Sequence, residues 1–182
     1  MQPRPGIRLV YGEPKQQRKG VVSVMVGFVI GNGVPSRGFV STKETLLALE
    51  KYERFAADLG LHWPATGQQI GHMKLEIRPN IIRGTHVVWT DYGPFYSKFM
   101  PVFKRLGLAQ MLELRVLSDL KKRYPKIASV RHTGIENARR RQLAKRGSAE
   151  GFVPYGLEIE RIKTKIRADV AKGRNITLAR RP

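Results

Sequence analysis

The pattern of apolar and polar positions along the chain predicts a protein that combines strands with helices. Residues 21–30 are rich in β-branched side chains and predict a strand. Residues 73–78 alternate apolar with polar side chains, as a half-buried strand does. Two more strands are predicted at residues 85–92 and 95–100, and these last three segments together would form an antiparallel meander.

A first helix is predicted between residues 41 and 60. Ser41 and Glu44 have the spacing of a capping box, in which two side chains satisfy free backbone amides at a helix start. Apolar residues follow at helical spacing as far as Gly60, which is a natural helix end.

The second half of the chain alternates between predicted helices and strands. Apolar residues on one side of residues 108–123 predict an amphipathic helix that ends before Pro125. Residues 127–130 predict a short buried strand. A very basic helix is predicted at residues 137–146, and a final strand is predicted at residues 155–162.

The length of 182 residues suits one sizeable core rather than two domains. We therefore expect one α+β domain at residues 20–162, with a mixed, mostly antiparallel sheet and flanking helices. Residues 1–19 are polar and basic and are expected to form an N-terminal arm, with a short edge strand at residues 7–11 as the alternative. Residues 163–182 are expected to form a basic C-terminal tail, with a partly helical tail as the alternative.

The composition excludes several classes of site. The chain contains no cysteine, which excludes disulfides, thiolate zinc sites and a cysteine nucleophile. No apolar run is long enough to span a bilayer, and the first residues lack the apolar core of a signal peptide, so we expect a cytoplasmic protein without a membrane span. No metal site is expected, because metal-ligand spacing is missing from the four histidines, His62, His72, His86 and His132.

Charge is the most unusual property of the chain. Lysine and arginine number 34 against 14 aspartate and glutamate residues, which gives a formal net charge of +20. Such a field favours polyanions such as nucleic acid or an anionic membrane surface, or a place in a ribosome or virion, and a solvated basic face is the alternative. The residues expected to contact nucleic acid are Arg139, Arg140, Arg141, Lys145, Arg146, Lys163, Lys165 and Arg167. Aromatic residues do not interleave with this cluster, so no base-stacking platform is expected there.

Candidate chemistry is found just before the helix at residues 108–123. Gly107 would let the backbone turn tightly, and the helix start adds a partial positive charge, so together they would form an anion site. Lys104 and Arg105 would supplement that charge. A purely structural turn at this glycine is the alternative.

The residues of this junction are Pro101, Lys104, Arg105, Leu106, Gly107, Leu108 and Ala109. They resemble the acetyl-CoA pyrophosphate loop of the Gcn5-related N-acetyltransferases, which reads Arg/Gln-x-x-Gly-x-Gly/Ala and often follows a proline. Lysine stands here at the first position. The order of predicted elements is also similar over residues 21–160, although the specific part is residues 99–147. The resemblance implies a GNAT-like acyl-CoA N-acyltransferase fold that transfers an acetyl group from acetyl-CoA to an amine.

The resemblance also implies a binding site for CoA. Phe99 and Met100, at the end of the fourth predicted strand, would pair with the pantetheine arm through their backbone. Residues 104–109 would hold the pyrophosphate, and Asn137 would sit near the thiol end of the pantetheine.

The chain departs from this family at positions that serve catalysis. Leu143 stands where many members have a tyrosine that protonates the leaving thiolate, and residues 95–100 contain no acid. A general base must lie within hydrogen-bond reach of the amine or of a relaying water. Glu76 and Asp91 are the candidates for that base, and Tyr96 is a candidate for holding the water.

Three functions agree with these observations. The first is an acetyl-CoA-dependent acyltransferase, which the junction at Gly107 favours. The second is a catalytically inactive protein of the same fold that binds nucleic acid or forms part of a nucleoprotein assembly, which Leu143 and the missing acid favour. The third is an unrelated α+β RNA-binding domain, which would explain the charge but not the junction.

Overall fold

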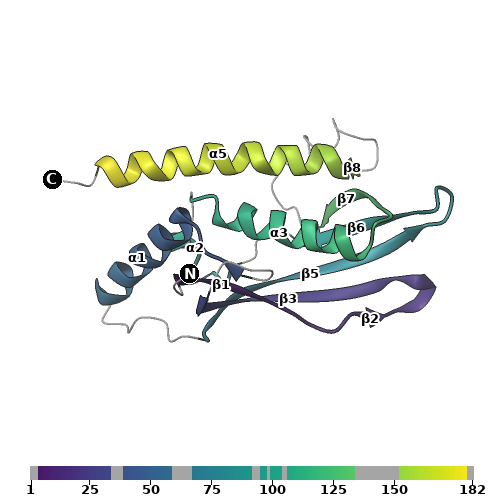
Figure 1. Ribbon diagram of the computed structural model, residues 1–182, viewed down its shortest axis with the longest axis horizontal. Coiled ribbons are helices and arrows are strands. Elements are labelled where there is room, and N and C mark those ends of the chain that lie inside the picture. Colours follow the sequence, from purple (N-terminus) through teal and green to yellow (C-terminus); the bar gives the residue numbers. More distant parts are fainter. Residues whose placement is uncertain are drawn as a thin grey trace.

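A computed structural model describes residues 4–33, 39–58, 67–91, 95–97, 99–103, 106–133 and 152–179. These residues fold into a sheet with helices stacked over one of its faces (Figure 1). The arrangement confirms the predicted fold class, α+β with a mostly antiparallel sheet and flanking helices. None of the helices in the described ranges is long and apolar enough to cross a membrane.

One sheet contains the eight described strands. The strands are β1 (Arg4–Tyr11), β2 (Lys15–Gln16), β3 (Val22–Gly33), β4 (Phe39–Val40), β5 (Gln69–Asn80), β6 (Thr85–Asp91), β7 (Ile127–Thr133) and β8 (Val153–Pro154). Their order across the sheet is β4-β1-β3-β5-β6-β7-β8, with β2 beside β3. Neighbouring strands run antiparallel except β6 and β7, which are parallel and are joined through a helix.

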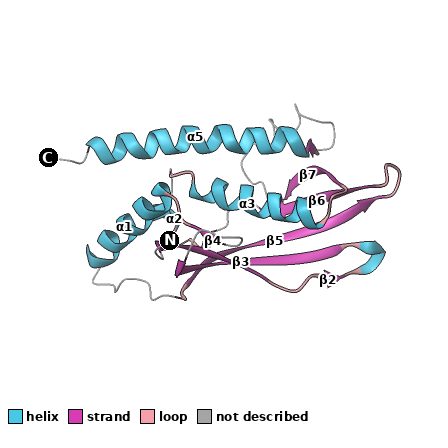
Figure 2. Cartoon of the chain, in the orientation of Figure 1, coloured by secondary structure: helices cyan, strands magenta, loops and turns pink. Residues whose placement is uncertain are grey.

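The helices form two layers over the sheet (Figure 2). α1 (Lys43–Asp58) and α3 (Leu108–Arg123) make up the layer next to the sheet, and the short α2 (Met100–Phe103) precedes α3. α5 (Tyr155–Ala179) forms the outer layer and contacts α3, β7 and β8. A short 3₁₀ helix, η1 (Arg18–Gly20), connects β2 with β3.

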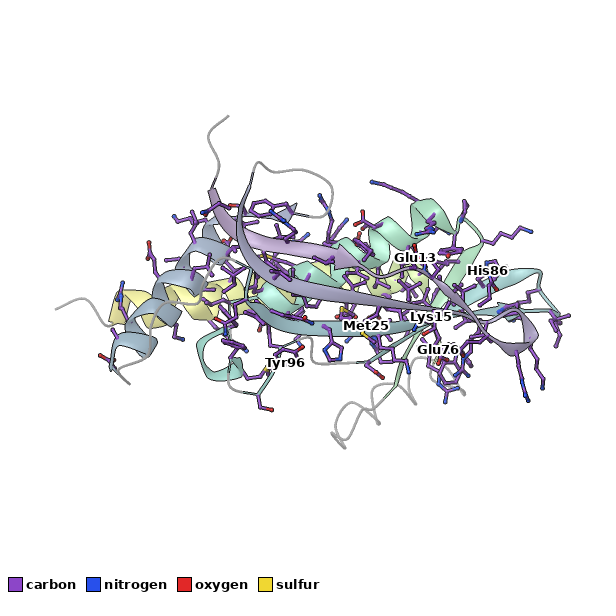
Figure 3. The ribbon with its side chains drawn as sticks, turned by 90° about the horizontal axis from the view of Figure 1, so that it is seen from below. Glu13, Lys15, Met25, Glu76, His86 and Tyr96 are labelled. Atoms are coloured by element: carbon purple, nitrogen blue, oxygen red, sulfur yellow. The ribbon has the colours of Figure 1, made fainter. Side chains whose placement is uncertain are left out.

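Side chains alternate along the strands and give the sheet a buried face and an open face. On β3, Val24 and Phe28 are 2% and 0% exposed and lie on the helix side, whereas Met25 is 49% exposed on the other side. The buried face meets one apolar side of α3, formed by Leu108, Leu112, Val116, Leu117 and Leu120. Figure 3 views the open face, with Met25, Glu76 and Tyr96 in front of the sheet and the helices behind it.

The strand predicted at residues 95–100 does not form. Phe95 makes one isolated bridge with Gly71, after which the chain turns into α2. The reason is the spacing of the aromatic side chains, because Phe95, Phe99 and Phe103 are all buried and lie four positions apart. Phe103 packs against both of the others, with ring centroids 5.0 Å from Phe95 and 6.2 Å from Phe99. A period of four residues suits a helical turn, whereas a strand buries every second residue.

The strand predicted at residues 155–162 is also wrong, because these residues begin α5. The helix continues through residues 163–179, which were expected to form a tail. Glu158, Ile162 and Val170 are buried at intervals that are multiples of four, so one side of a helix faces the core. The polar residues between them had hidden this period.

Residues 4–11 lie in the segment that was expected to form an arm, yet they form β1. Ile7 and Leu9 are 0% and 5% exposed and belong to the core. The Tyr11 hydroxyl donates a hydrogen bond of 2.6 Å to Asp119 of α3. β1 is also an interior strand, between β4 and β3, so this segment is part of the domain.

Candidate functional site

The junction before α3 brings Gly107 against the outer helix. Gly107 has φ +70°, a left-handed conformation that favours glycine, and it precedes the first residue of α3. A Cβ at this position would lie 3.2 Å from the Ile166 carbonyl oxygen and 3.3 Å from Val170 Cγ2 of α5. The glycine is therefore required by its backbone conformation and by the close approach of α5.

The other residues assigned to CoA are partly described. Phe99 is fully buried, and its amide, like that of Met100, donates a hydrogen bond to the Tyr96 carbonyl oxygen. These two amides serve the turn into α2 and do not lie on a strand edge. Leu106 and Leu108 are buried, and Ala109 is partly buried against the core. Lys104, Arg105 and Asn137 lie outside the described residues.

The three catalytic candidates lie on the side of the sheet away from Gly107. Glu76 alternates with the buried residues of β5 and forms an ion pair of 2.6 Å with Arg78. Asp91 is exposed at the end of β6. Tyr96 is 36% exposed, and its hydroxyl lies 3.4 Å from Nδ1 of His72. The structure therefore does not bring them together with the junction before α3.

A group of cations gathers at one end of the sheet, which we call the basic end. It consists of Arg18, Lys19, Arg83, Lys122, Arg123 and Lys126, and all six are exposed. Two contacts show that their segments are neighbours. A Cβ on Gly20 would lie 3.5 Å from Pro79 Cγ, and the His86 amide donates a hydrogen bond of 2.9 Å to the Lys126 carbonyl oxygen. Both hairpins, β2–β3 and β5–β6, end at the right of Figure 1.

The basic end is not neutralised by carboxylates. The three segments that form it, residues 17–21, 80–85 and 122–126, contain no aspartate or glutamate. Within the described part of the chain, none of its six cations takes part in an ion pair. Lys121, in contrast, donates its Nζ protons to the carbonyl oxygens of Pro125 and Ile127. The six cations therefore face solvent without a carboxylate partner among the described residues, and Arg123 also lies over the Tyr124 ring, with its guanidinium carbon 5.9 Å from the ring centroid.

The sequence missed the basic end because its segments are far apart in the chain. The cluster predicted from sequence consists of other residues, and five of them, Arg139, Arg140, Arg141, Lys145 and Arg146, are outside the described residues. Lys163, Lys165 and Arg167 lie on α5, where Lys163 approaches Glu160 at 3.4 Å. Two pairs of adjacent cations in the sequence could have indicated the basic end. Arg18 and Lys19 precede the strand at residues 21–30, and Lys122 and Arg123 end the helix at residues 108–123.

A buried group of ionisable side chains links three elements. His132 of β7 lies between Glu158 of α5, at 2.5 Å, and Glu113 of α3, at 3.7 Å. The other ring nitrogen of His132 lies 2.8 Å from the Thr90 hydroxyl. Arg161 donates two hydrogen bonds to the two carboxylate oxygens of Glu158, at 2.9 and 2.5 Å.

The electrostatics of this group favour an ionised Glu158. Burial would raise the pKa of Glu158, but hydrogen bonds from His132 and Arg161 outweigh burial and lower the pKa to about 2. Ligand atoms of Glu113, His132 and Glu158 lie within 4.8 Å of one another, close enough for a shared metal ion. Arg161 already neutralises Glu158, however, so we interpret the group as an ionic link that holds α5 to α3 and β7.

Trp89 forms the centre of a stack of side chains on the open face. The guanidinium carbons of Arg78 and Arg131 lie 3.7 and 4.3 Å from its ring centroid, and Phe152 meets its edge at 6.1 Å. These residues come from β5, β6, β7 and the segment before β8, so the stack ties neighbouring strands together. Both arginines are already engaged with Trp89, and the stack therefore has a structural role.

Comparison of the chain with protein-family models, with curated proteins and with solved structures found no match. The resemblance of residues 99–147 to the Gcn5-related N-acetyltransferases therefore stays a prediction. Of the groups of side chains described above, the basic end is the one that combines six exposed cations with no ion pair among the described residues.

Proposed function

We propose that the protein binds nucleic acid through its basic end and serves as a component of a nucleoprotein assembly. The observation that supports this proposal is that six cations are exposed at the basic end, and that the three segments that contain them have no aspartate or glutamate. The net charge of +20 adds a long-range attraction toward polyanions. Lysine and arginine side chains that meet phosphates release condensed counterions, which supplies affinity independent of base sequence.

Salt dependence gives the sharpest test of this proposal. For duplex DNA, the slope of log binding constant against log salt is about −0.9 for each phosphate neutralised. The double variant Arg83→Gln/Lys126→Gln removes two cations of the basic end. It should weaken binding to a short duplex and make the slope shallower by about 2.

The matched control removes the same charge from another part of the molecule. Lys43 and Arg54 are exposed on α1, away from the basic end (Figure 1). Lys43→Gln/Arg54→Gln should leave the slope close to that of the wild type. Equal slopes in the two double variants would reject the basic end as the binding surface.

Acetyl transfer from acetyl-CoA to an amine is a second candidate. The observation in its favour is the unit β6–α3–β7, in which parallel strands are joined through a helix that follows a glycine of positive φ. The resemblance implies the same strand–helix–strand order, although it places the first strand at residues 95–100, where the chain instead turns into α2. A helix start carries a partial positive charge suited to a pyrophosphate.

Calorimetric titration of the nuclease-treated protein with acetyl-CoA tests this second candidate. If the protein transfers acetyl groups, the wild type should bind acetyl-CoA. Lys104→Gln/Arg105→Gln should lose most of the affinity for acetyl-CoA, whereas Lys43→Gln/Arg54→Gln should retain it. Absence of any binding by the folded wild type would reject acetyl transfer and leave the nucleic-acid proposal untouched.

A further inference from the structure

The turn between β5 and β6 exposes two large apolar side chains at the basic end. Ile81 and Ile82 are 89% and 97% exposed. Turns normally use glycine, proline, asparagine, aspartate or serine, because these residues suit turn backbones and water. Two adjacent β-branched residues at a turn therefore need an explanation outside the folded chain. Burial of both side chains against a partner would stabilise the complex, because it would remove their apolar surface from water.

The turn is held in one shape although its tip is apolar. The Asn80 side-chain oxygen accepts a hydrogen bond of 3.3 Å from the Arg83 amide. Gly84 has φ +63° and closes the turn, and Asn80 pairs with Thr85 at the ends of the two strands. The isoleucines are therefore presented on a preformed support, which lowers the entropy lost when a partner binds.

We infer that Ile81 and Ile82 form a wedge that enters base-paired nucleic acid between adjacent base pairs while the basic end holds the flanking phosphates. This inference rests on the proposed function and names the form of nucleic acid that the same surface takes. Apolar wedges of this kind enter from the minor groove, unstack a base step and bend the duplex. Arg83 follows the wedge directly and would meet a phosphate beside the opened step.

Charge and side-chain chemistry favour a duplex over a single strand. Single-strand platforms stack successive bases on aromatic rings, and residues 80–85 contain no aromatic residue. Tyr124 is the one aromatic residue in the three segments of the basic end, and it is partly buried against the core. Branched aliphatic side chains have no flat ring on which a base could stack, but they fill the gap between two separated base pairs. The duplex also offers a high density of phosphates to cations that come from three segments.

Fluorescence of 2-aminopurine, which rises when the base is unstacked, tests the wedge. The probe is a short duplex with 2-aminopurine at its central step, made once as DNA and once as RNA. Wild-type protein should raise the fluorescence severalfold on at least one of the two duplexes. A rise on one duplex alone would also show whether the wedge enters DNA or RNA. Ile81→Ser/Ile82→Ser should lose that rise and keep the wild-type salt slope, because its cations are intact.

Leu157→Ser is the control, because Leu157 is 65% exposed at the start of α5, a different part of the fold. It should behave as the wild type does. A salt-dependent complex with no fluorescence rise, or an equal rise with Ile81→Ser/Ile82→Ser, would overturn the wedge and leave the proposed function standing. Absence of any duplex binding would overturn both.

The competing hypothesis is docking to an anionic membrane, since isoleucines beside cations also suit an anionic bilayer. Vesicles of phosphatidylcholine and phosphatidylglycerol test it. Membrane docking predicts that the wild type sediments with these vesicles and that Ile81→Ser/Ile82→Ser does not. That result, together with no rise in 2-aminopurine fluorescence on either duplex, would reject the wedge in favour of membrane docking. Failure to sediment, together with the fluorescence rise, would support the wedge.

Discussion

Gly107 controls how closely α5 can approach the start of α3. Its φ is positive, and a Cβ here would lie only 3.2 Å from the Ile166 carbonyl oxygen, so a side chain would be both strained and crowded. The sequence predicted a tight turn here correctly. It could not predict the contact with α5, because that contact joins segments far apart in the chain.

We expect Gly107→Ala to lower the free energy of unfolding by about 1–3 kcal/mol, since the variant combines a strained φ with a crowded Cβ. Gly156 in the first turn of α5 offers the matched control, because a Cβ there meets nothing within 4 Å. Gly156→Ala should be neutral or stabilising by up to about 1 kcal/mol. Urea denaturation of both variants measures the difference, and equal effects would contradict this role for Gly107.

At the level of elements, α5 depends on an ionic link as well as on apolar packing. Glu158 is fully buried, and its neighbours His132 and Arg161 come from β7 and from the next turn of α5. A carboxylate whose pKa is lowered on folding stabilises the folded state above its unfolded pKa, and that stability is lost as pH falls toward the folded pKa.

For Glu158 the pH window runs from 4.5 down to about 2. The wild type should lose up to about 3 kcal/mol of stability from this group across that window. Glu158→Gln should be less stable at neutral pH and should lack this part of the acid dependence, as measured by urea midpoints at several pH values. Glu160 is largely exposed. If Glu160→Gln changed the acid dependence as much as Glu158→Gln, the ionic link would not be its source.

Most of the helices and strands of the sheet and of the layer next to it could be predicted from the sequence. Segments with a clear period were correct, and the strands at residues 21–30, 73–78, 85–92 and 127–130 and the helices at residues 41–60 and 108–123 match β3, β5, β6, β7, α1 and α3. Strands were wrongly predicted at residues 95–100 and 155–162, and the segments expected to form an arm and a tail contain β1 and most of α5. In the two wrongly predicted strands, the apolar residues fitted both a strand and a helical turn, so a period of two could not be told from a period of four.

For the whole molecule, composition indicated the type of partner that we propose, but it could not indicate the surface that we propose for it. The net charge of +20 indicated a polyanion. The basic end could not be predicted, because its cations come from η1, from the β5–β6 turn and from the end of α3 with the residues that follow it. Their convergence depends on the strand order of the sheet, which places the ends of β3, β5 and β6 side by side.

The position of α5 in the chain also has a consequence for biosynthesis. α5 follows α3 and β7, yet it covers the start of α3 and supplies the partner carboxylate of His132. A nascent chain that has emerged only as far as β7 would therefore present part of α3 to solvent, and His132 would lack the carboxylate of Glu158. Such an intermediate is the kind of species that chaperones hold. Emergence of α5 from the ribosome is the event that closes the helical layers.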